Sequence, residues 1–258
     1  MISKNQIKLV MSLKHKKFRT QHSLFLVEGY RNCSEVLKSD FSIQRFFYTE
    51  DSNKSSRNAK LITEFKSSAV KCESVSPSEM NAISDTVTTQ GMVAIVHLPA
   101  EDHSPKLNEM DDVLCLESIS DPGNLGAIIR TAAWFGVDSI FLSSDSVDRF
   151  NPKVVRSSAG AIFQIPIFIM SDLNDILNRA AENGFTKIAT IPHGGKNIYE
   201  YKFPGRSIIL FGSEANGLSD DIMLQTDVII SIPSKGRGES LNLAISCGIV
   251  LGVKTVSS

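Results

Sequence analysis

Three short loops rich in glycine and small polar residues each follow an apolar, strand-like run, and they are the part of this sequence best suited to chemistry. They span residues 121–126, 212–217 and 234–240. Glycine has no Cβ, so a loop that contains it can bring its backbone close to a small ligand. In α/β proteins such loops meet beyond the carboxyl ends of parallel strands, where cofactors bind. The pattern therefore predicts a small-cofactor site built from three loops.

Several familiar cofactor and catalytic motifs do not occur in the sequence. There is no Gly-Lys-Ser/Thr of a Walker loop, and Gly123 and Gly126 supply only two of the three glycines of the dinucleotide fingerprint, at the wrong spacing. No Gly-x-Ser-x-Gly elbow of an acyl hydrolase is present. Histidines and cysteines are scattered rather than grouped at metal-ligand spacing, so no metal is expected. These observations disfavour a kinase, a nicotinamide-dependent dehydrogenase and an acyl hydrolase.

The elements that would hold the three loops alternate between strand and helix. From residue 113 onward, alternation of this kind predicts parallel strands with helices on both faces of the sheet. The expected strands are 113–116, 139–142, 163–170, 186–191, 207–211 and 228–232. The expected helices are 127–135, 151–158, 172–182, 219–224 and 241–253.

A second α/β unit is expected before this one, over residues 1–98. Its predicted strands are 23–28, 43–48, 70–75 and 91–98, its predicted helices are 5–13, 30–37, 59–65 and a short one from Pro77, and residues 14–22 are predicted to form a loop. Residues 99–112 are polar and contain two prolines, which is typical of a linker. The predicted domains are therefore 1–98 and 113–258, joined by the linker 99–112.

Composition narrows the protein class. The chain has 258 residues, 42% of them hydrophobic, and a formal net charge of −1. No apolar run approaches the ~20 residues of a spanning helix, and the N-terminus lacks the apolar segment of a signal peptide. None of the four cysteines lies within four residues of another. A reduced, cytoplasmic location with no membrane partner is expected.

Charge is distributed unevenly along the chain. The first 31 residues carry seven lysines and arginines against one acid, Glu28. A local basic patch can bind a polyanion even when the whole protein is nearly neutral. A solvated helix face would explain the same composition.

Long motifs in these loops resemble one known family. Residues 121–132 (DPGNLGAIIRTA), 211–218 (FGSEANGL) and 232–244 (IPSKGRGESLNLA) resemble, in order, the three motifs of the SpoU/TrmH family, the RNA ribose 2′-O-methyltransferase branch of the SPOUT class. Residues 151–161 (NPKVVRSSAGA) fit its middle segment. Residues 25–29 (FLVEG) resemble the family's L30e-like substrate-binding domain.

The resemblance implies a fold and an activity that the residues alone do not establish. It implies an α/β methyltransferase domain with a C-terminal trefoil knot, an N-terminal L30e-like domain, and an active site formed across a homodimer. The implied activity is S-adenosylmethionine-dependent methylation of a ribose 2′-hydroxyl in RNA. The separate N-terminal domain favours ribosomal RNA. Transfer RNA as substrate, or a catalytically silent RNA-binding or ribosome-assembly protein with the same fold, remains open.

The resemblance also assigns roles to individual residues. Arg130 would lie at the reaction centre, where it would bind an RNA phosphate and orient the ribose, or would accept the 2′-hydroxyl proton. A guanidinium is rarely neutral, which favours positioning over base catalysis. Asn124 and Glu214 would hydrogen-bond Arg130 or brace the loops. Ser240 is also suited to capping the final helix, and the weak helix propensity of Asn242 predicts a polar partner.

Two further groups of residues complete the expected site. The residues implied for cofactor binding are Leu210, Phe211, Gly212, Gly217, Ile232, Pro233 and Leu241. Turn geometry alone would also explain the two glycines. The residues expected to contact RNA are His15, Lys16, Lys17, Arg19 and Arg156. For Arg156 a dimer interface or an ordinary surface position is an equal alternative.

Overall fold

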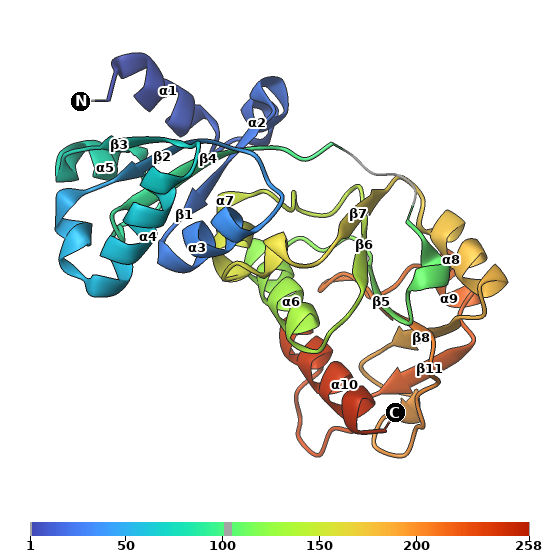
Figure 1. Ribbon diagram of the computed structural model, residues 1–258. Helices are drawn as coiled ribbons and strands as arrows, with labels where there is room; N and C mark the ends of the chain where they lie inside the picture. The colour runs from blue at the N-terminus through green and yellow to red at the C-terminus, as the bar shows by residue number, and fades with distance from the viewer. Residues whose placement is uncertain (1, 101–104, 258) are drawn as a thin grey trace. The chain divides into compact units, whose positions relative to one another are not determined.

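The chain folds into two compact units. The computed structural model describes residues 2–100 and 105–257 (Figure 1). Unit 1 contains Met1–Ala100 and Asp148–Gln164, and unit 2 contains Glu101–Val147 and Ile165–Ser258. The linker expected at 99–112 falls partly on residues 101–104, which lie outside the described residues. Its second half joins unit 2, where Leu107 is buried in the core.

Unit 2 is built on a parallel sheet, as the sequence predicts. Every strand pair in it is parallel, and the strand order is β7-β6-β5-β10-β8-β11-β9. The strands are β5 (Asp112–Leu116), β6 (Ser139–Ser143), β7 (Ile167–Met170), β8 (Thr186–Thr190), β9 (Lys196–Asn197), β10 (Ser207–Phe211) and β11 (Val228–Ser231). The central strands β5 and β10 are apolar and almost fully buried, which is the pattern of strands covered on both faces.

Helices follow most of these strands. They are η2 (Leu107–Glu109), α6 (Pro122–Trp134), α8 (Leu173–Glu182), α9 (Asp220–Leu224) and α10 (Leu243–Ser257). Helix α8 packs Ile176, Leu177 and Ala180 into a cluster with Phe141 and Leu210 of the sheet. This cluster is one part of the core of unit 2.

Three expected boundaries in this half of the sequence are wrong. Residues 121–126 are not a loop, because α6 begins at Pro122 and Asp121 caps it by accepting the Asn124 backbone N–H at 2.8 Å. The final helix begins at Leu243 instead of residue 241. The strand expected from residue 163 begins only at Ile167. In each case capping or turn geometry moved the boundary, and composition alone does not resolve such detail.

Unit 1 contains a mixed four-stranded sheet. Its order is β1-β4-β2-β3, with β4 antiparallel to both β1 and β2, and β3 parallel to β2. The strands are β1 (Leu24–Glu28), β2 (Ile43–Tyr48), β3 (Lys71–Ser74) and β4 (Met92–His97). The helices are α1 (Lys4–Ser12), α2 (Lys16–His22), α3 (Tyr30–Lys38), η1 (Glu50–Lys54), α4 (Ser56–Ser67), α5 (Pro77–Ile83), α7 (Pro152–Ser157) and η3 (Ala161–Phe163).

The loop expected at residues 14–22 is instead largely the helix α2. Arg19 explains the difference, because its guanidinium is buried and donates to the carbonyls of Leu13 and Lys14, each at 2.9 Å. These tertiary contacts stabilise as a helix a segment whose polar composition is typical of a loop. Ser23, in the left-handed region at φ 53°, ends the helix.

The segment Asp148–Gln164 lies between β6 and β7 in sequence but packs in unit 1. Phe150 packs against Phe25 of β1 with the two rings tilted and their centroids 4.4 Å apart, and Phe163 meets Phe41 edge-on at 5.3 Å. Asp148 pairs with Arg19. The fold therefore builds unit 1 from two separate stretches of chain.

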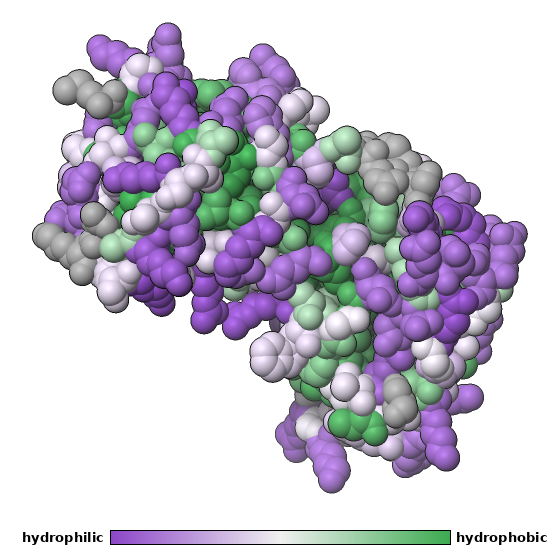
Figure 2. Space-filling model, viewed as in Figure 1, coloured by the Kyte–Doolittle hydropathy of each residue, from purple (hydrophilic) through white to green (hydrophobic). Residues whose placement is uncertain are grey.

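Polar side chains cover most of the surface seen in Figure 2, and apolar ones appear between them in patches. Across the described ranges 2–100 and 105–257, no helix is both long and apolar enough to cross a membrane.

Candidate active site

The loop after β10 is closed on itself by its own backbone. Ser213 and Gly217 exchange two N–H···O bonds of 3.0 Å. A Cβ on Gly212 would lie 2.0 Å from the carbonyl carbon of Gly217, so no other residue fits there. Gly217 has φ 71°, a conformation that favours glycine. The geometry of the turn therefore explains both glycines, and it presents a preformed loop at the end of a central strand.

A series of side-chain hydrogen bonds joins this loop to the start of α6 and to the start of α10. Asn242 Nδ2 donates to Asn124 Oδ1 at 2.9 Å, and Asn124 Nδ2 donates to Glu214 Oε1 at 2.8 Å. The backbone N–H of Ser120 approaches Glu214 Oε2 at 3.5 Å. The structure thus brings together three of the five predicted catalytic residues. Glu214 lies 90 residues and Asn242 lies 118 residues after Asn124 in the sequence.

Asn242 also begins the last helix. Its Oδ1 accepts the backbone N–H groups of Ala244 and Ile245 at 3.0 and 3.3 Å. The predicted polar partner of Asn242 is therefore Asn124. The suggestion that Ser240 caps the helix is wrong: Ser240 is exposed and lies two residues before the capping residue.

Helices α6 and α10 pack against each other, and the order of their contacts along the two helices shows that they run in the same direction. A Cβ added to Gly248 would lie 3.7 Å from Thr131, and one added to Gly252 would lie 3.6 Å from Phe135. Glycines spaced by four residues let the two backbones approach closely. The far end of α10 is held by buried Lys254, whose Nζ is 2.7 Å from Asp112 Oδ1 at the start of β5.

Arg130 extends from α6 into solvent. It is exposed and forms no hydrogen bond or ion pair with any residue that the structure describes. Of the two roles considered for Asn124 and Glu214, their geometry fits bracing of the loops, because they bond each other and not Arg130. The guanidinium is left free to meet a ligand.

Sequence reasoning missed the residues that hold the loop after β5. Glu117 Oε2 accepts the backbone N–H of Ser219 at 2.8 Å, and the Ser118 N–H donates to Ser143 Oγ at 2.8 Å. Hydroxyl donation from Ser118 and Ser143 lowers the pKa of Asp145 below its ordinary value. All are polar residues just beyond strand ends, which is the signal that could have found them.

The residues expected around the cofactor differ in what they can offer. Leu210 and Phe211 are fully buried in β10, so only their backbone is available. Ile232 is half-buried and Pro233 exposed. Leu241 is 50% exposed, which leaves an apolar surface directly beside Asn242. An adenosyl group could cover this surface while the loop backbone supplies hydrogen bonds.

The basic residues expected to contact RNA divide into two groups. His15, Lys16 and Lys17 are exposed around the start of α2. Arg19 is 2% exposed, and its Nε donates to Asp148 Oδ2 at 2.9 Å, so its predicted contact with RNA is wrong. The cause is burial: Arg19 ties α2 to the segment that carries α7. Arg156 pairs with Asp85 at 2.6 Å and keeps part of its guanidinium exposed.

Two family models match the chain. The SpoU rRNA Methylase family matches residues 111–252. The chain belongs to this family. The second model, an MRM3-like substrate binding domain, matches residues 4–94.

Relatives of this SpoU family member align over nearly its whole length. An uncharacterized tRNA/rRNA methyltransferase of Synechocystis is 33% identical, over 95% of this chain and 88% of the relative. The 23S rRNA (guanosine(2553)-2′-O)-methyltransferase of Bacillus subtilis is 29% identical, over 96% of each. The crystal structure of an AdoMet-bound rRNA methyltransferase from Sinorhizobium meliloti superposes with a TM-score of 0.84 at 26% identity, over 98% of this chain and 96% of that one.

The SpoU family uses S-adenosylmethionine, and the residues present fit it. The preformed loop 212–217 and the exposed stretch 233–241 offer backbone donors and acceptors. Ile232 and Leu241 offer the apolar surface that an adenine ring needs. Within the part of the chain that is described, no group of three or more His, Cys, Asp or Glu could hold a metal ion.

Proposed function

We propose that this SpoU family member transfers a methyl group from S-adenosylmethionine to a ribose 2′-hydroxyl of RNA, and that its substrate is ribosomal RNA. The observation that carries this proposal is the bonded series Asn242–Asn124–Glu214, which ties the three family loops into one site beside the free Arg130. Relatives that align over the whole chain, among them the Bacillus subtilis enzyme, are named as rRNA methyltransferases.

In the proposed site the sulfonium of the cofactor supplies an activated methyl group with a good leaving group. The protein must align the ribose 2′-oxygen and accommodate one proton. Arg130 binds the phosphate next to the target ribose through its planar set of N–H donors and so orients the 2′-oxygen. Asn124, Glu214 and Asn242 keep the loops in place around it.

The cofactor is held by three sets of groups in this proposal. The loop 212–217 and the backbone of Leu210 and Phe211 would hold the ribose and methionine parts. Ile232 and Leu241 would enclose the adenine, with Pro233 shaping the loop between them. Ser240, exposed and two residues before the helix cap, is free to bond the cofactor or the RNA.

The C-terminal segment is proposed to form a trefoil knot. β11 lies beyond β8 and β10 in the sheet, yet α10 begins beside α6, which follows β5. Residues 232–242 must therefore pass back across the carboxyl ends of β8 and β10, where the loop 212–217 lies. Threading of that segment through the loop would produce the knot.

A homodimer is also part of the proposal. Ile245 and Val256 on α10 are 56% and 84% exposed, and Trp134 at the end of α6 is 83% exposed. Large apolar side chains exposed on neighbouring helices are typical of an interface. Sedimentation of the purified chain tests this point, and a monomer at micromolar concentration would contradict it.

Unit 1 is proposed to be the RNA-binding, L30e-like domain, with His15, Lys16, Lys17 and Arg156 contacting phosphates. Its family match as a substrate binding domain supports this role. The four free cysteines agree with a cytoplasmic place of action beside ribosomes.

The decisive experiment incubates the full chain with labelled S-adenosylmethionine and either deproteinised bacterial ribosomal RNA or bulk transfer RNA. We expect one 2′-O-methyl group per ribosomal RNA, mapped by the resistance of the neighbouring phosphodiester to alkaline hydrolysis. Transfer to transfer RNA alone would change the substrate class. Cofactor binding without any transfer would favour a silent RNA-binding protein.

A further inference from the structure

Unit 1 contains a pocket at the start of α3. Its volume is about 270 Å³, and its walls come from the turn between β1 and α3, from α4, from the chain before β4, and from α7. This is just below the ~300–1,000 Å³ of typical small-ligand sites, which suits one nucleotide better than a duplex. Arg31, Arg57 and Arg156 all line it.

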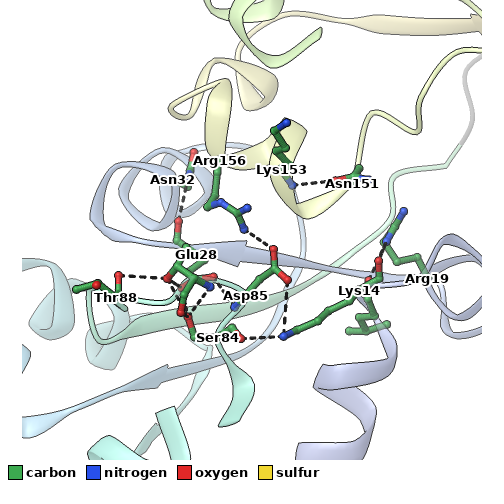
Figure 3. Close-up of polar contacts among 12 residues, drawn as sticks. Lys14, Arg19, Glu28, Asn32, Ser84, Asp85, Thr88, Asn151, Lys153 and Arg156 are labelled. Carbon is green, nitrogen blue, oxygen red and sulfur yellow. Dashed lines mark hydrogen bonds and ion pairs between the residues drawn. The ribbon is translucent and has the colours of Figure 1, made fainter. Parts of the chain in front are cut away.

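The positive charge of the pocket is largely available. Arg31 is exposed and bonds no other described residue, and the Arg57 guanidinium lies 4.3 Å from the centre of the Tyr30 ring. Arg156 uses one nitrogen, Nη1, to pair with Asp85 Oδ2 at 2.6 Å (Figure 3). That pair fixes the guanidinium in the pocket wall and leaves its other N–H groups for a ligand.

The acidic residue that lines the pocket is Glu28, and its carboxylate is already engaged (Figure 3). It accepts the backbone N–H of Asp85 at 3.0 Å, the Thr86 hydroxyl at 2.6 Å and the Ser84 hydroxyl. Glu28 thus braces the loop that follows α5. Three guanidinium groups face one internally bonded carboxylate, so the pocket attracts anions.

The pocket also contains a buried acceptor that lacks a donor. Asn32 is 5% exposed and lines the pocket, and its Oδ1 has no hydrogen-bond partner. Its Nδ2 donates to the Glu28 carbonyl at 3.0 Å, so flipping the amide would set two oxygens against each other. Buried polar groups are normally satisfied. That oxygen is closed to solvent, so Asn32 shapes the wall of the pocket while the arginines carry ligand binding.

We propose that this pocket binds a single nucleotide of the RNA substrate. The phosphate lies against the arginines and the positive end of α3, where the first backbone N–H groups point. The Tyr30–Arg57 pair offers a flat face on which a base can stack. The proposal rests on the proposed function, because it presumes that the substrate is RNA.

The pocket unites the two stretches of chain that form unit 1. Arg156 and Ala159 come from the segment between β6 and β7, and the other lining residues come from the N-terminal hundred. A nucleotide bound here would contact both. The nucleotide site is therefore distinct from the exposed basic residues His15, Lys16 and Lys17, which do not line the pocket.

The test measures binding of a fluorescein-labelled, mixed-sequence, single-stranded 12-nucleotide RNA to the full chain by anisotropy, without cofactor and over a range of salt. The pocket variant is R31Q/R57Q. Its matched control is K38Q/K60Q, which removes the same charge from the same two helices at exposed positions outside the pocket.

We expect R31Q/R57Q to lower RNA affinity about tenfold or more relative to K38Q/K60Q. The slope of log affinity against log salt should become shallower by about 0.7 for each phosphate that the variant no longer binds.

Equal RNA affinity of R31Q/R57Q and K38Q/K60Q would overturn the proposal that the pocket binds RNA. Methyl transfer to ribosomal RNA is measured separately on the unmodified chain. RNA bound through the pocket without any transfer would refute the proposed function and leave the nucleotide site standing. Methyl transfer by the unmodified chain, together with unaltered RNA binding by R31Q/R57Q, would support the proposed function and refute the nucleotide site.

Discussion

Asn242 makes two separable contributions, which allows a quantitative test of the site. Its Oδ1 caps α10 by accepting from Ala244 and Ile245, and its Nδ2 joins α10 to Asn124. Asn242→Ala removes both. Loss of an Asn cap costs about 1 kcal/mol, and loss of an exposed hydrogen bond costs about 0.5–1 kcal/mol. The first turn of α10 should therefore be destabilised by about 1.5–2 kcal/mol.

Asn242→Asp separates the two contributions. A carboxylate still caps the helix and favours its positive end, but it has no N–H to donate to Asn124. Its destabilisation should stay below about 1 kcal/mol. Methyl transfer should fall in both variants, because both disconnect the loops that Asn124 and Glu214 hold together.

Amide hydrogen exchange of the peptide that starts α10, read by mass spectrometry, measures these effects locally. For Asn242→Ala, 1.5–2 kcal/mol corresponds to exchange about 10–30 times faster in the first turn. Asn242→Asp should exchange within about fivefold of the unmodified chain. Equal exchange rates in all three proteins would show that Asn242 does not cap α10. Equally fast exchange in both variants would show that the helix cap and the hydrogen bond to Asn124 are not separate contributions.

Three further outcomes are expected. Arg130→Ala should abolish methyl transfer while the affinity for S-adenosylmethionine, measured by calorimetry, stays unchanged. Arg130→Lys should restore little of the methyl transfer, because lysine lacks the planar set of N–H donors. Near-full methyl transfer by either variant would contradict the assignment of Arg130. Gly212→Ala should abolish cofactor binding, because the added Cβ would lie 2.0 Å from the Gly217 backbone. Gly236→Ala should bind the cofactor normally, because a Cβ there has nothing within 4 Å. Equal cofactor affinity of the two variants would contradict the loop geometry. Burial raises the pKa of the Cys33 and Cys115 thiols, and it raises the pKa of Cys247 to about 12. Iodoacetamide at pH 8 should therefore spare these thiols in the folded chain, and rapid alkylation would show that they are accessible. Their contribution to stability is complete below the unfolded pKa of about 8.5 and should decline as the pH rises from there toward 12.

The local pattern of the sequence was sufficient for the sheet and for the expectation that three segments after strands meet at one edge of it. Period and composition identify most strands of both units, because a buried parallel strand is a continuous apolar run bounded by glycine or polar residues. The run 207–211 coincides with β10. Loops that follow such strands in a parallel sheet must meet at one edge, so the grouping of Asn124, Glu214 and Asn242 could be expected.

Contacts between distant segments decided what the sequence could not. Whether Arg19 meets RNA or stays inside depends on Asp148, 129 residues away, and only the fold places the two together. The same holds for Asn242, whose role as helix cap depends on where α10 starts. Short polar segments carry no period that would reveal such partners.

By itself, then, the sequence determined an α/β protein with three glycine-containing segments after strands and a set of polar residues that chemistry would use. The tertiary structure decided which of those residues bond one another, that residues 148–164 complete the N-terminal unit, and that three arginines line one pocket. The physical reason is that hydrogen bonds and burial are properties of atoms in space, and residues far apart in the chain acquire them only when the core has packed.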